Sequence, residues 1–197
     1  DVGQGVDISA YDPEMPFQIP DALKNISQPR IGYIGDINSM RLDADLIYEL
    51  AKSKPACSFV MIGPEDQLFK NHALHSLKNV HFTGSIAKHD VPQYMNALDV
   101  CLNPQLINEI TIGNYPRKVD EYLALGKPVI ATTTNTMELF KDHVYLCSNA
   151  DEYKVALEKA LAENTEEKKN QRIQFARSHS WKNNVQQIYN QIEKLVN

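Results

Sequence analysis

Short apolar runs alternate with stretches of helical periodicity between residues 30 and 147 of the chain. The apolar runs that suit buried strands lie at residues 30–34, 58–62, 80–83, 99–103, 128–131 and 144–147. Glycine or proline follows several of them, as expected where a strand ends in a loop. Strands separated by helical stretches are typical of right-handed βαβ units and of a parallel sheet.

Apolar residues in the intervening stretches recur every three or four positions, which predicts helices. Helices are expected on this basis at residues 42–51, 68–76, 89–98, 153–162, 166–178 and 181–195, and a further short one leads through Gly126 into the strand at 128–131. The last helix gathers Val185, Ile188, Tyr189 and Ile192 on one face. The sequence therefore predicts an α/β fold, a Rossmann-like doubly wound parallel sheet with additional helices at its C-terminal end.

The chain divides into a connector, residues 1–29, and one domain, residues 30–197. The connector holds four of the ten prolines and has little periodicity. The chain begins Asp1-Val2-Gly3-Gln4, without methionine or an apolar leader, so we expect it to be a domain cut from a longer protein. No apolar run approaches the roughly 18 residues that a membrane-spanning helix needs.

Composition narrows the classes of function. Hydrophobic residues at 43% and charged residues at 23% are ordinary for a globular protein, and the net charge of −5 argues against general affinity for nucleic acid. Cys57, Cys101 and Cys147 lie in or beside apolar runs, and we expect them to be buried thiols in a reducing cytoplasm. His72 and His75 lack further metal ligands nearby, which favours solvent-facing loop positions.

The stretch PRKVDEYLALGKPVIAT, residues 116–132, carries the clearest chemistry. It places Lys118 and Glu121 in the opening turn of a short helix. A helix N-terminus presents unpaired backbone N–H groups and the positive end of a dipole, which suits a phosphate. Lys118 adds a positive charge there, and Glu121 can accept hydrogen bonds from two sugar hydroxyls. This combination predicts a site for a sugar nucleotide.

This stretch resembles the donor-binding signature of retaining glycosyltransferases of the group 1 (family 4) kind, which have the two-domain GT-B fold. Residues 30–64 and 79–104 precede it in the order that the family shows, and Gly5-Val6-Asp7 resembles its usual step into the second domain. The resemblance implies that residues 30–197 are the nucleotide-sugar-binding half of a GT-B fold. Residues 1–29 would then be the linker from an N-terminal domain.

The resemblance also assigns residues to the loop after the first strand. Gly35 lets the backbone turn closely, and Arg41 matches a family lysine that contacts the diphosphate. Asp36 replaces the arginine that usually follows this glycine, so one of two expected cationic contacts is absent. The alternative is that Arg41 is only a solvated charge at the start of a helix.

Two further loops are implicated by the same comparison. Gly84, Ser85 and Ile86 follow the third strand and correspond to the loop that passes the nucleobase, unless they form a simple glycine turn. Many relatives carry two glutamates in an E-x7-E pattern, of which Glu121 matches the second, while Gly113 occupies the position of the first. Glu109, Thr111 and Asn114 are then the expected contacts to the transferred sugar, unless this loop is a polar surface without a ligand. Pro116 and Val119 would line the helix start.

The implied activity is transfer of a sugar from a nucleotide diphosphate to an acceptor hydroxyl, in cell-surface polysaccharide or glycan biosynthesis. Lys118, Arg41 and Glu109 are the expected catalytic residues; the two cations would stabilise charge on the departing diphosphate. No metal or other cofactor is expected. The partners implied are the N-terminal domain, without which this chain should be inactive, and a glycan or lipid-linked sugar as acceptor. The expected location is the cytoplasm, including the inner face of the membrane.

Two other classes remain as alternatives. A non-hydrolysing sugar-nucleotide epimerase shares the GT-B architecture and would return an isomeric sugar nucleotide without an acceptor. A receiver-like signalling module is also doubly wound, but it needs an aspartate at the end of the third strand. Here that strand ends at Thr83-Gly84, and Asp99 begins a strand.

Overall fold

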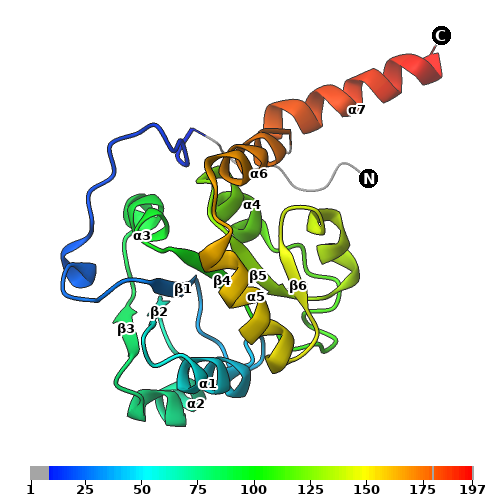
Figure 1. Cartoon of the computed structure of the whole chain (residues 1–197). Helices are drawn as coiled ribbons and strands as arrows, with labels where there is room; N and C mark the ends of the chain where they lie inside the picture. Colours follow the sequence, from blue (N-terminus) through cyan, green and yellow to red (C-terminus); the bar gives the residue numbers. More distant parts are fainter. Residues whose placement is uncertain (1–8, 179, 197) are drawn as a thin grey trace.

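The computed structural model describes residues 9–178 and 180–196, and it contains one parallel sheet of six strands in the order β3-β2-β1-β4-β5-β6 (Figure 1). The strands are β1 (Arg30–Ile34), β2 (Ser58–Ile62), β3 (Val80–Gly84), β4 (Val100–Asn103), β5 (Val129–Thr132) and β6 (Tyr145–Cys147). All five neighbouring pairs are parallel. The predicted fold class, a doubly wound α/β sheet, is confirmed.

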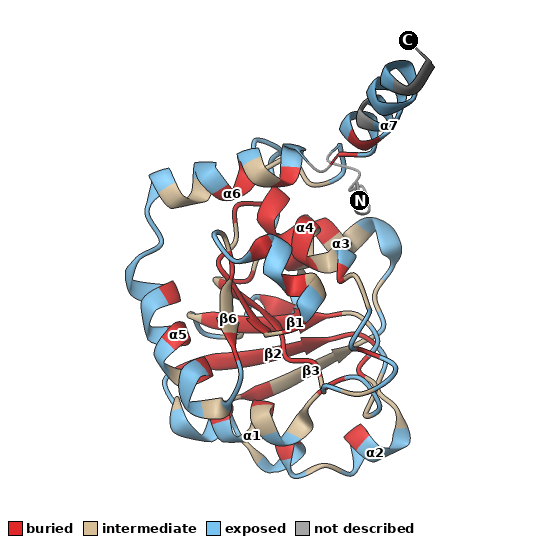
Figure 2. Ribbon diagram, turned by 90° about the vertical axis from the view of Figure 1, so that its right-hand side faces the viewer, coloured by how far each residue is buried: buried red, intermediate tan, exposed pale blue. Residues whose placement is uncertain are grey.

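Helices cover both faces of the sheet (Figure 2). One face carries α1 (Ala44–Ser53), α2 (Gln67–Lys70) and α5 (Ala150–Ala162), and the other carries α3 (Val91–Asn96), α4 (Arg117–Ala124) and α6 (Glu166–Ser178). Successive strand residues point to opposite faces. Thus Phe59 and Met61 enter one buried cluster, whereas Val60 and Ile62 enter the other. The predicted burial of all three cysteines is confirmed.

Two predicted helices are broken in the structure. The stretch expected at 68–76 divides into α2 and a 3₁₀ turn at Ala73–Ser76, because the ring of His72 caps that turn by accepting from the Leu74 amide at 3.2 Å. The stretch expected at 89–98 divides into a 3₁₀ turn at Lys88–Asp90 and α3. Short 3₁₀ helices at Asp21–Leu23 and Asn135–Phe140 had no clear apolar period to indicate them.

The two histidines expected at solvent-facing loop positions differ in exposure: His75 is exposed, whereas His72 is half-buried. His75 stacks on Phe82 with ring centroids 4.0 Å apart and lies 2.8 Å from a Glu65 carboxylate oxygen. His72 lies 3.1 Å from Asp45. Each ring thus has a carboxylate partner from another segment of the chain.

The strand order reverses between β1 and β4, which lie side by side at the centre of the sheet. After β1 the chain builds outward to β2 and β3, and it then returns to β4 on the other side. The loops that follow β1 and β4 lie side by side at the carboxyl ends of the strands, where the Asp43 amide donates to the Pro104 carbonyl at 2.9 Å. In open α/β sheets, ligands bind at this switch point.

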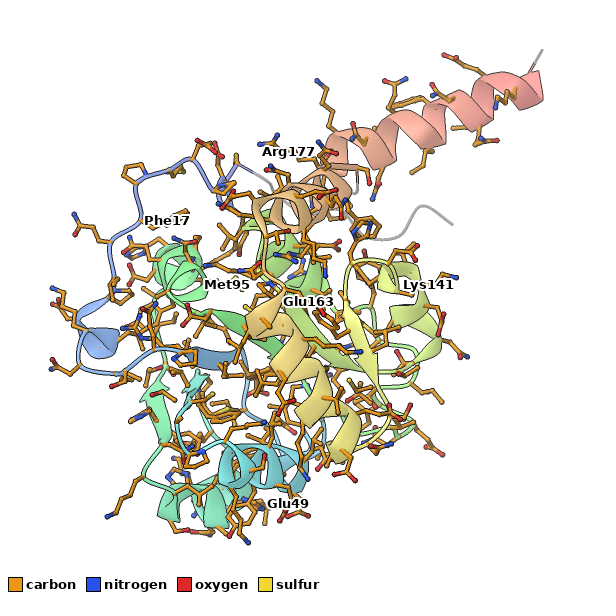
Figure 3. All side chains as sticks on the ribbon, viewed as in Figure 1. Phe17, Glu49, Met95, Lys141, Glu163 and Arg177 are labelled. Atoms are coloured by element: carbon orange, nitrogen blue, oxygen red, sulfur yellow. The ribbon has the colours of Figure 1, made fainter. Side chains whose placement is uncertain are left out.

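The two ends of the described chain lie outside this sandwich (Figure 1). Residues 9–29 run along the α3 side, and Figure 3 shows Phe17 of this segment beside α3. The last helix, α7 (Trp181–Val196), extends away from the sheet, and its apolar residues Val185, Ile188 and Ile192 are exposed. Gly5-Val6-Asp7 lies outside the described residues, so its resemblance to the family linker stays a prediction.

Candidate functional site

Close backbone packing shapes the carboxyl edge of the sheet beside the switch point. Gly35, directly after β1, has φ of 139° and donates its N–H to the Ile62 carbonyl at 2.9 Å. Gly63, directly after β2, has φ of 140°, and a Cβ there would lie 1.9 Å from the Gly35 carbonyl oxygen. Only glycine fits this contact. Gly84 pairs with Gly63 in an isolated bridge, which brings the loop after β3 to the same edge.

Lys118 reaches this edge from the first turn of α4. Its Nζ donates to the Tyr33 hydroxyl at 2.5 Å and lies 3.8 Å from the centre of the Tyr33 ring. A Cβ on Gly35 would come within 2.7 Å of the same Nζ. The structure therefore brings together Lys118 and Gly35, two predicted site residues that are 83 positions apart in the chain. Tyr33 is a neighbour that the sequence analysis missed.

Charged groups from the loop after β1 and from α4 affect the pKa of Lys118. Burial lowers the pKa of Lys118 to about 7, and Arg41 adds to this effect by repulsion, whereas Glu121 and Asp36 oppose it. Arg41 itself is exposed, and its backbone carbonyl accepts from the Leu106 amide at 2.9 Å. Arg41 and Glu121 thus both act electrostatically on Lys118.

Glu121 lies one turn further along α4, half-buried at the wall of a cavity of about 740 Å³. Its carboxylate accepts a hydrogen bond from the Tyr11 side chain. Burial raises the pKa of Glu121, and Arg117, Tyr11, Lys118 and Lys88 oppose that rise, in this order. The cavity is also lined by Phe17, Lys88 and Arg117. Aromatic residues in a proline-rich connector were the only sequence signal for Tyr11 and Phe17.

The loop after β4, residues 104–116, is held by its own hydrogen bonds. The Thr111 hydroxyl is buried, donates to the Leu106 carbonyl and accepts from the Asn108 amide at 3.1 Å. Asn108 also donates to the Met40 carbonyl at 2.8 Å, which fastens this loop to the one after β1. Thr111 therefore shapes the loop, and the structure gives no support to its predicted sugar contact. Glu109 is exposed and Asn114 half-buried, so these two remain accessible.

The start of α4 holds two further predicted site residues, Pro116 and Val119. Pro116 precedes the helix, and its carbonyl accepts from the Val119 amide at 2.8 Å. The Val119 side chain is fully buried in the core beneath the helix. The side chain of Val119 thus packs in the core, and its place in the site stays a prediction. Ser85 is exposed and Ile86 half-buried after β3, on the same edge as Gly84.

A buried acid within the same helix turn was not predicted. Asp120 is 1% exposed; its Oδ2 accepts from the Tyr115 hydroxyl at 2.7 Å, while Oδ1 has no partner among the described residues. Burial raises the pKa of Asp120 to about 7, and Glu121 adds to the rise, whereas the Tyr115 hydrogen bond opposes it. The Tyr115 ring packs on Phe140 with centroids 5.7 Å apart. An aspartate in a first helical turn usually indicates a solvated residue that favours the dipole, so sequence gave no sign of this burial.

Residues 9–178 and 180–196 hold no cluster of three or more histidine, cysteine, aspartate or glutamate side chains suited to a metal ion. Within the same ranges, no helix combines the length and apolar character needed to cross a bilayer.

A doubly wound sheet with tight glycine turns at its switch point and a cationic helix start beside them defines a nucleotide-binding type of α/β domain. Residues 28–167 match the family model described as glycosyl transferases group 1. The chain belongs to this family. The resemblance drawn from residues 116–132 and the preceding stretches is thereby confirmed.

Relatives and solved structures extend this finding. The chain is 34% identical, over 192 residues, to a putative teichuronic acid biosynthesis glycosyltransferase, TuaH, of Bacillus subtilis (strain 168), covering 90% of this chain and 47% of the relative. The fold is similar to that of Anabaena Alr3699/HepE in complex with UDP-glucose, with a TM-score of 0.73 at 21% identity over 96% of this chain and 56% of that one. It is also similar to a glycosyltransferase from Rickettsia africae ESF-5, with a TM-score of 0.76 at 14% identity over 99% and 56%. The chain thus spans about half the length of these proteins.

Proposed function

We propose that this chain is the donor-binding half of a glycosyltransferase that moves a sugar from a nucleotide diphosphate to an acceptor hydroxyl. Membership of the group 1 family supports the reaction class. The relative that carries the words teichuronic acid biosynthesis supports a role in a cell-surface polysaccharide. The structural neighbour that holds UDP-glucose supports a nucleotide-sugar donor.

The observation that carries the proposal is the position of Lys118 above Gly35 at the switch point, with Glu121 one turn along α4. A diphosphate in this place would meet the ammonium group and the backbone of the glycine turn. The adjacent ribose would reach the Glu121 carboxylate, whose remaining lone pairs can accept from two hydroxyls. The Tyr11 hydroxyl, which now donates to Glu121, occupies one of these acceptor positions.

The chemistry proposed for this site is electrostatic. Sugar transfer through an oxocarbenium-like transition state leaves negative charge on the departing diphosphate, and fixed positive groups lower the energy of that charge. Lys118 and Arg41 would supply it, and Glu109 would lie near the transferred sugar. Because the pKa of Lys118 lies at about 7 without ligand, an arriving diphosphate would favour its protonated form.

The proposal extends to partners and cofactors. The acceptor, a glycan or a lipid-linked sugar, would bind mainly to an N-terminal domain that lies outside this chain. The reaction would need no metal, because the cationic side chains take the place of one at the diphosphate. A cytoplasmic location, including the inner membrane face, stays a prediction.

The strand order separates the receiver-like module from a glycosyltransferase, but it does not separate the epimerase from one. A receiver-like module has the strand order 2-1-3-4-5, whereas this sheet has the order 3-2-1-4-5-6, which speaks against that class. An epimerase would share the architecture, so only its product, a free isomeric sugar nucleotide, separates it from a transferase. Family membership favours the transferase.

The proposal is tested by titrating the chain with UDP, GDP and ADP while recording backbone NMR spectra. We expect one diphosphate to perturb residues around Gly35, Lys118 and Glu121. Glu121→Ala should weaken that binding about tenfold or more, since it removes hydrogen bonds to a charged acceptor. Glu158→Ala on α5 serves as the control and should bind as before, because Glu158 pairs with Lys54 and not with a residue of the proposed site. Perturbations that spare Lys118 and Glu121 would contradict the proposal.

A further inference from the structure

Tyr33 is a buried tyrosine whose hydroxyl group lies at the candidate site. It is the fourth residue of β1 and is 4% exposed, and its ring belongs to the core that α1 and α5 cover. Two hydrogen bonds fix the hydroxyl. It donates to the Asp36 backbone carbonyl at 3.1 Å and accepts from Lys118 Nζ at 2.5 Å.

The directions of these two hydrogen bonds follow from the chemistry of the groups. A carbonyl oxygen can only accept, so the single phenolic hydrogen is committed to Asp36. The phenolic oxygen therefore presents only lone pairs to Lys118, and an ammonium group can only donate. Tyr33 is thus oriented as an acceptor for a charged lysine, and the turn after β1 holds it in that orientation.

The ring of Tyr33 adds a second contact to the same nitrogen. Nζ lies 3.8 Å from the ring centre, within the range of a cation–π interaction. The absence of a side chain at Gly35 leaves the space that Nζ occupies, because a Cβ there would be 2.7 Å away. Ring, hydroxyl and glycine together define one place for the lysine head group.

We propose that Tyr33 is a positioning residue for the donor diphosphate, because it holds the Lys118 ammonium group above Gly35 before the ligand arrives. This inference rests on the proposed function for the identity of the ligand. The lysine would then meet the diphosphate without a search among its many rotamers, which reduces the entropy lost on binding. The side chain of Tyr33 would act through Lys118 and need not touch the donor.

The charged groups around Lys118 show why such support is needed. Arg41, from the loop after β1, repels the ammonium group, whereas Asp36 from that loop and Glu121 from α4 attract it. Burial outweighs these charges and lowers the pKa of Lys118. Removal of the Tyr33 hydroxyl would take away an acceptor that stabilises the charged form, so a larger share of Lys118 would become neutral.

The test compares Tyr33→Phe and Tyr33→Leu with Tyr48→Phe, a matched change on α1 outside the site. The first measurement is the titration of the Lys118 side-chain NMR signal without ligand. We expect the pKa of Lys118 to fall in Tyr33→Phe and to stay unchanged in Tyr48→Phe. The second measurement is the affinity for UDP by calorimetry at pH 6 and pH 8. We expect Tyr33→Phe to weaken binding about tenfold, with the larger loss at pH 8, and Tyr33→Leu to weaken it further.

The two measurements separate this inference from the proposed function. If the unsubstituted chain binds none of UDP, GDP and ADP, the proposed function fails, and the ligand-free titration decides the role of Tyr33 alone. A Lys118 titration in Tyr33→Phe that matches that of Tyr48→Phe overturns the inference. Equal UDP affinities in these two variants also overturn it. Thermal unfolding of each variant measures whether the core remains intact, which is expected for Tyr33→Phe because phenylalanine keeps the buried ring.

Discussion

Lys118 and Asp120 are two residues apart on α4, and burial moves their pKa values toward each other. The pKa of Lys118 is lowered to about 7, and the pKa of Asp120 is raised to about 7. In each case desolvation disfavours the charged form. Near neutral pH each side chain is therefore present in both its charged and its neutral form. Their surroundings differ: Lys118 lies beside the glycine turn, whereas Asp120 is enclosed with Tyr115.

Asp120→Asn should make the stability of the protein less dependent on pH. The pKa of Asp120 is about 7 in the folded state and near 3.8 in the unfolded chain. Between these values the folded state binds a proton that the unfolded state lacks, so this residue lowers stability as the pH rises from 4 to 7. At about 1.36 kcal/mol per pH unit, the loss is at most about 4 kcal/mol. Asparagine carries no such charge and can still accept from Tyr115.

The measurement is the free energy of unfolding in urea between pH 4 and pH 8. The difference between Asp120→Asn and the unsubstituted protein should move in favour of the variant as the pH rises, and level off above pH 7. Asp142→Asn, at an exposed position, is the control and should show a small and constant difference. A difference for Asp120→Asn that stays constant over this range would show that Asp120 is ionised in the folded protein throughout.

At the scale of elements, the ends of β1, β2 and β3 depend on contacts between backbone atoms. Gly63→Ala should cost at least about 3 kcal/mol, because its Cβ would lie 1.9 Å from the Gly35 carbonyl oxygen and its φ is 140°. Gly84→Ala should cost about 1 kcal/mol, since its φ is 70° but no atom lies within 4 Å of the added carbon. Urea denaturation measures both values.

Gly113→Ala provides the matched control for this series. Gly113 lies in the loop after β4, and no described atom lies within 4 Å of the position that a Cβ would take. Its substitution should change the free energy of unfolding by less than about 0.5 kcal/mol. If Gly63→Ala proved no more costly than Gly113→Ala, the close approach of the first two loops would be wrong, and with it the shape of the site.

The positions of strands and helices were predicted well where the burial of apolar side chains alone determines them. The six strands lie where the sequence has short apolar runs, because both faces of this sheet are covered and almost every strand residue must be apolar. The helix at 68–76 was predicted as one piece because its apolar residues fit a helical period. The cap formed by His72 divides it, and a side chain that binds its own backbone is invisible to periodicity.

At the scale of the whole molecule, the sequence indicated which distant residues lie close together at one edge of the sheet. Motif residues that are distant in sequence, such as Gly35 and Lys118, meet because parallel strands bring their carboxyl ends to one edge. Tyr33, Asp120 and Tyr11 were missed, because a tyrosine or aspartate looks the same in sequence whether its partner is water or a buried side chain. The burial of the Val119 side chain was not predicted for a related reason: a motif marks a helix turn but not which face of it is buried.

The last helix gives a prediction about the whole molecule. On α7, Val185 and Ile188 are 47% and 45% exposed, so a polar residue at either position loses little buried apolar contact. We expect Val185→Ser and Ile188→Ser to change the free energy of unfolding by less than about 0.5 kcal/mol.

Ile173→Ser on α6 is the matched comparison. Ile173 is 7% exposed and packs near Gly126, so its substitution should cost about 2–4 kcal/mol through lost contacts and a buried hydroxyl. Chemical denaturation of the three variants under one set of conditions separates these cases. Equal losses in all three would mean that the apolar face of α7 is covered in solution, either by the body of the molecule or by a second copy, and sedimentation at several concentrations would distinguish these two arrangements.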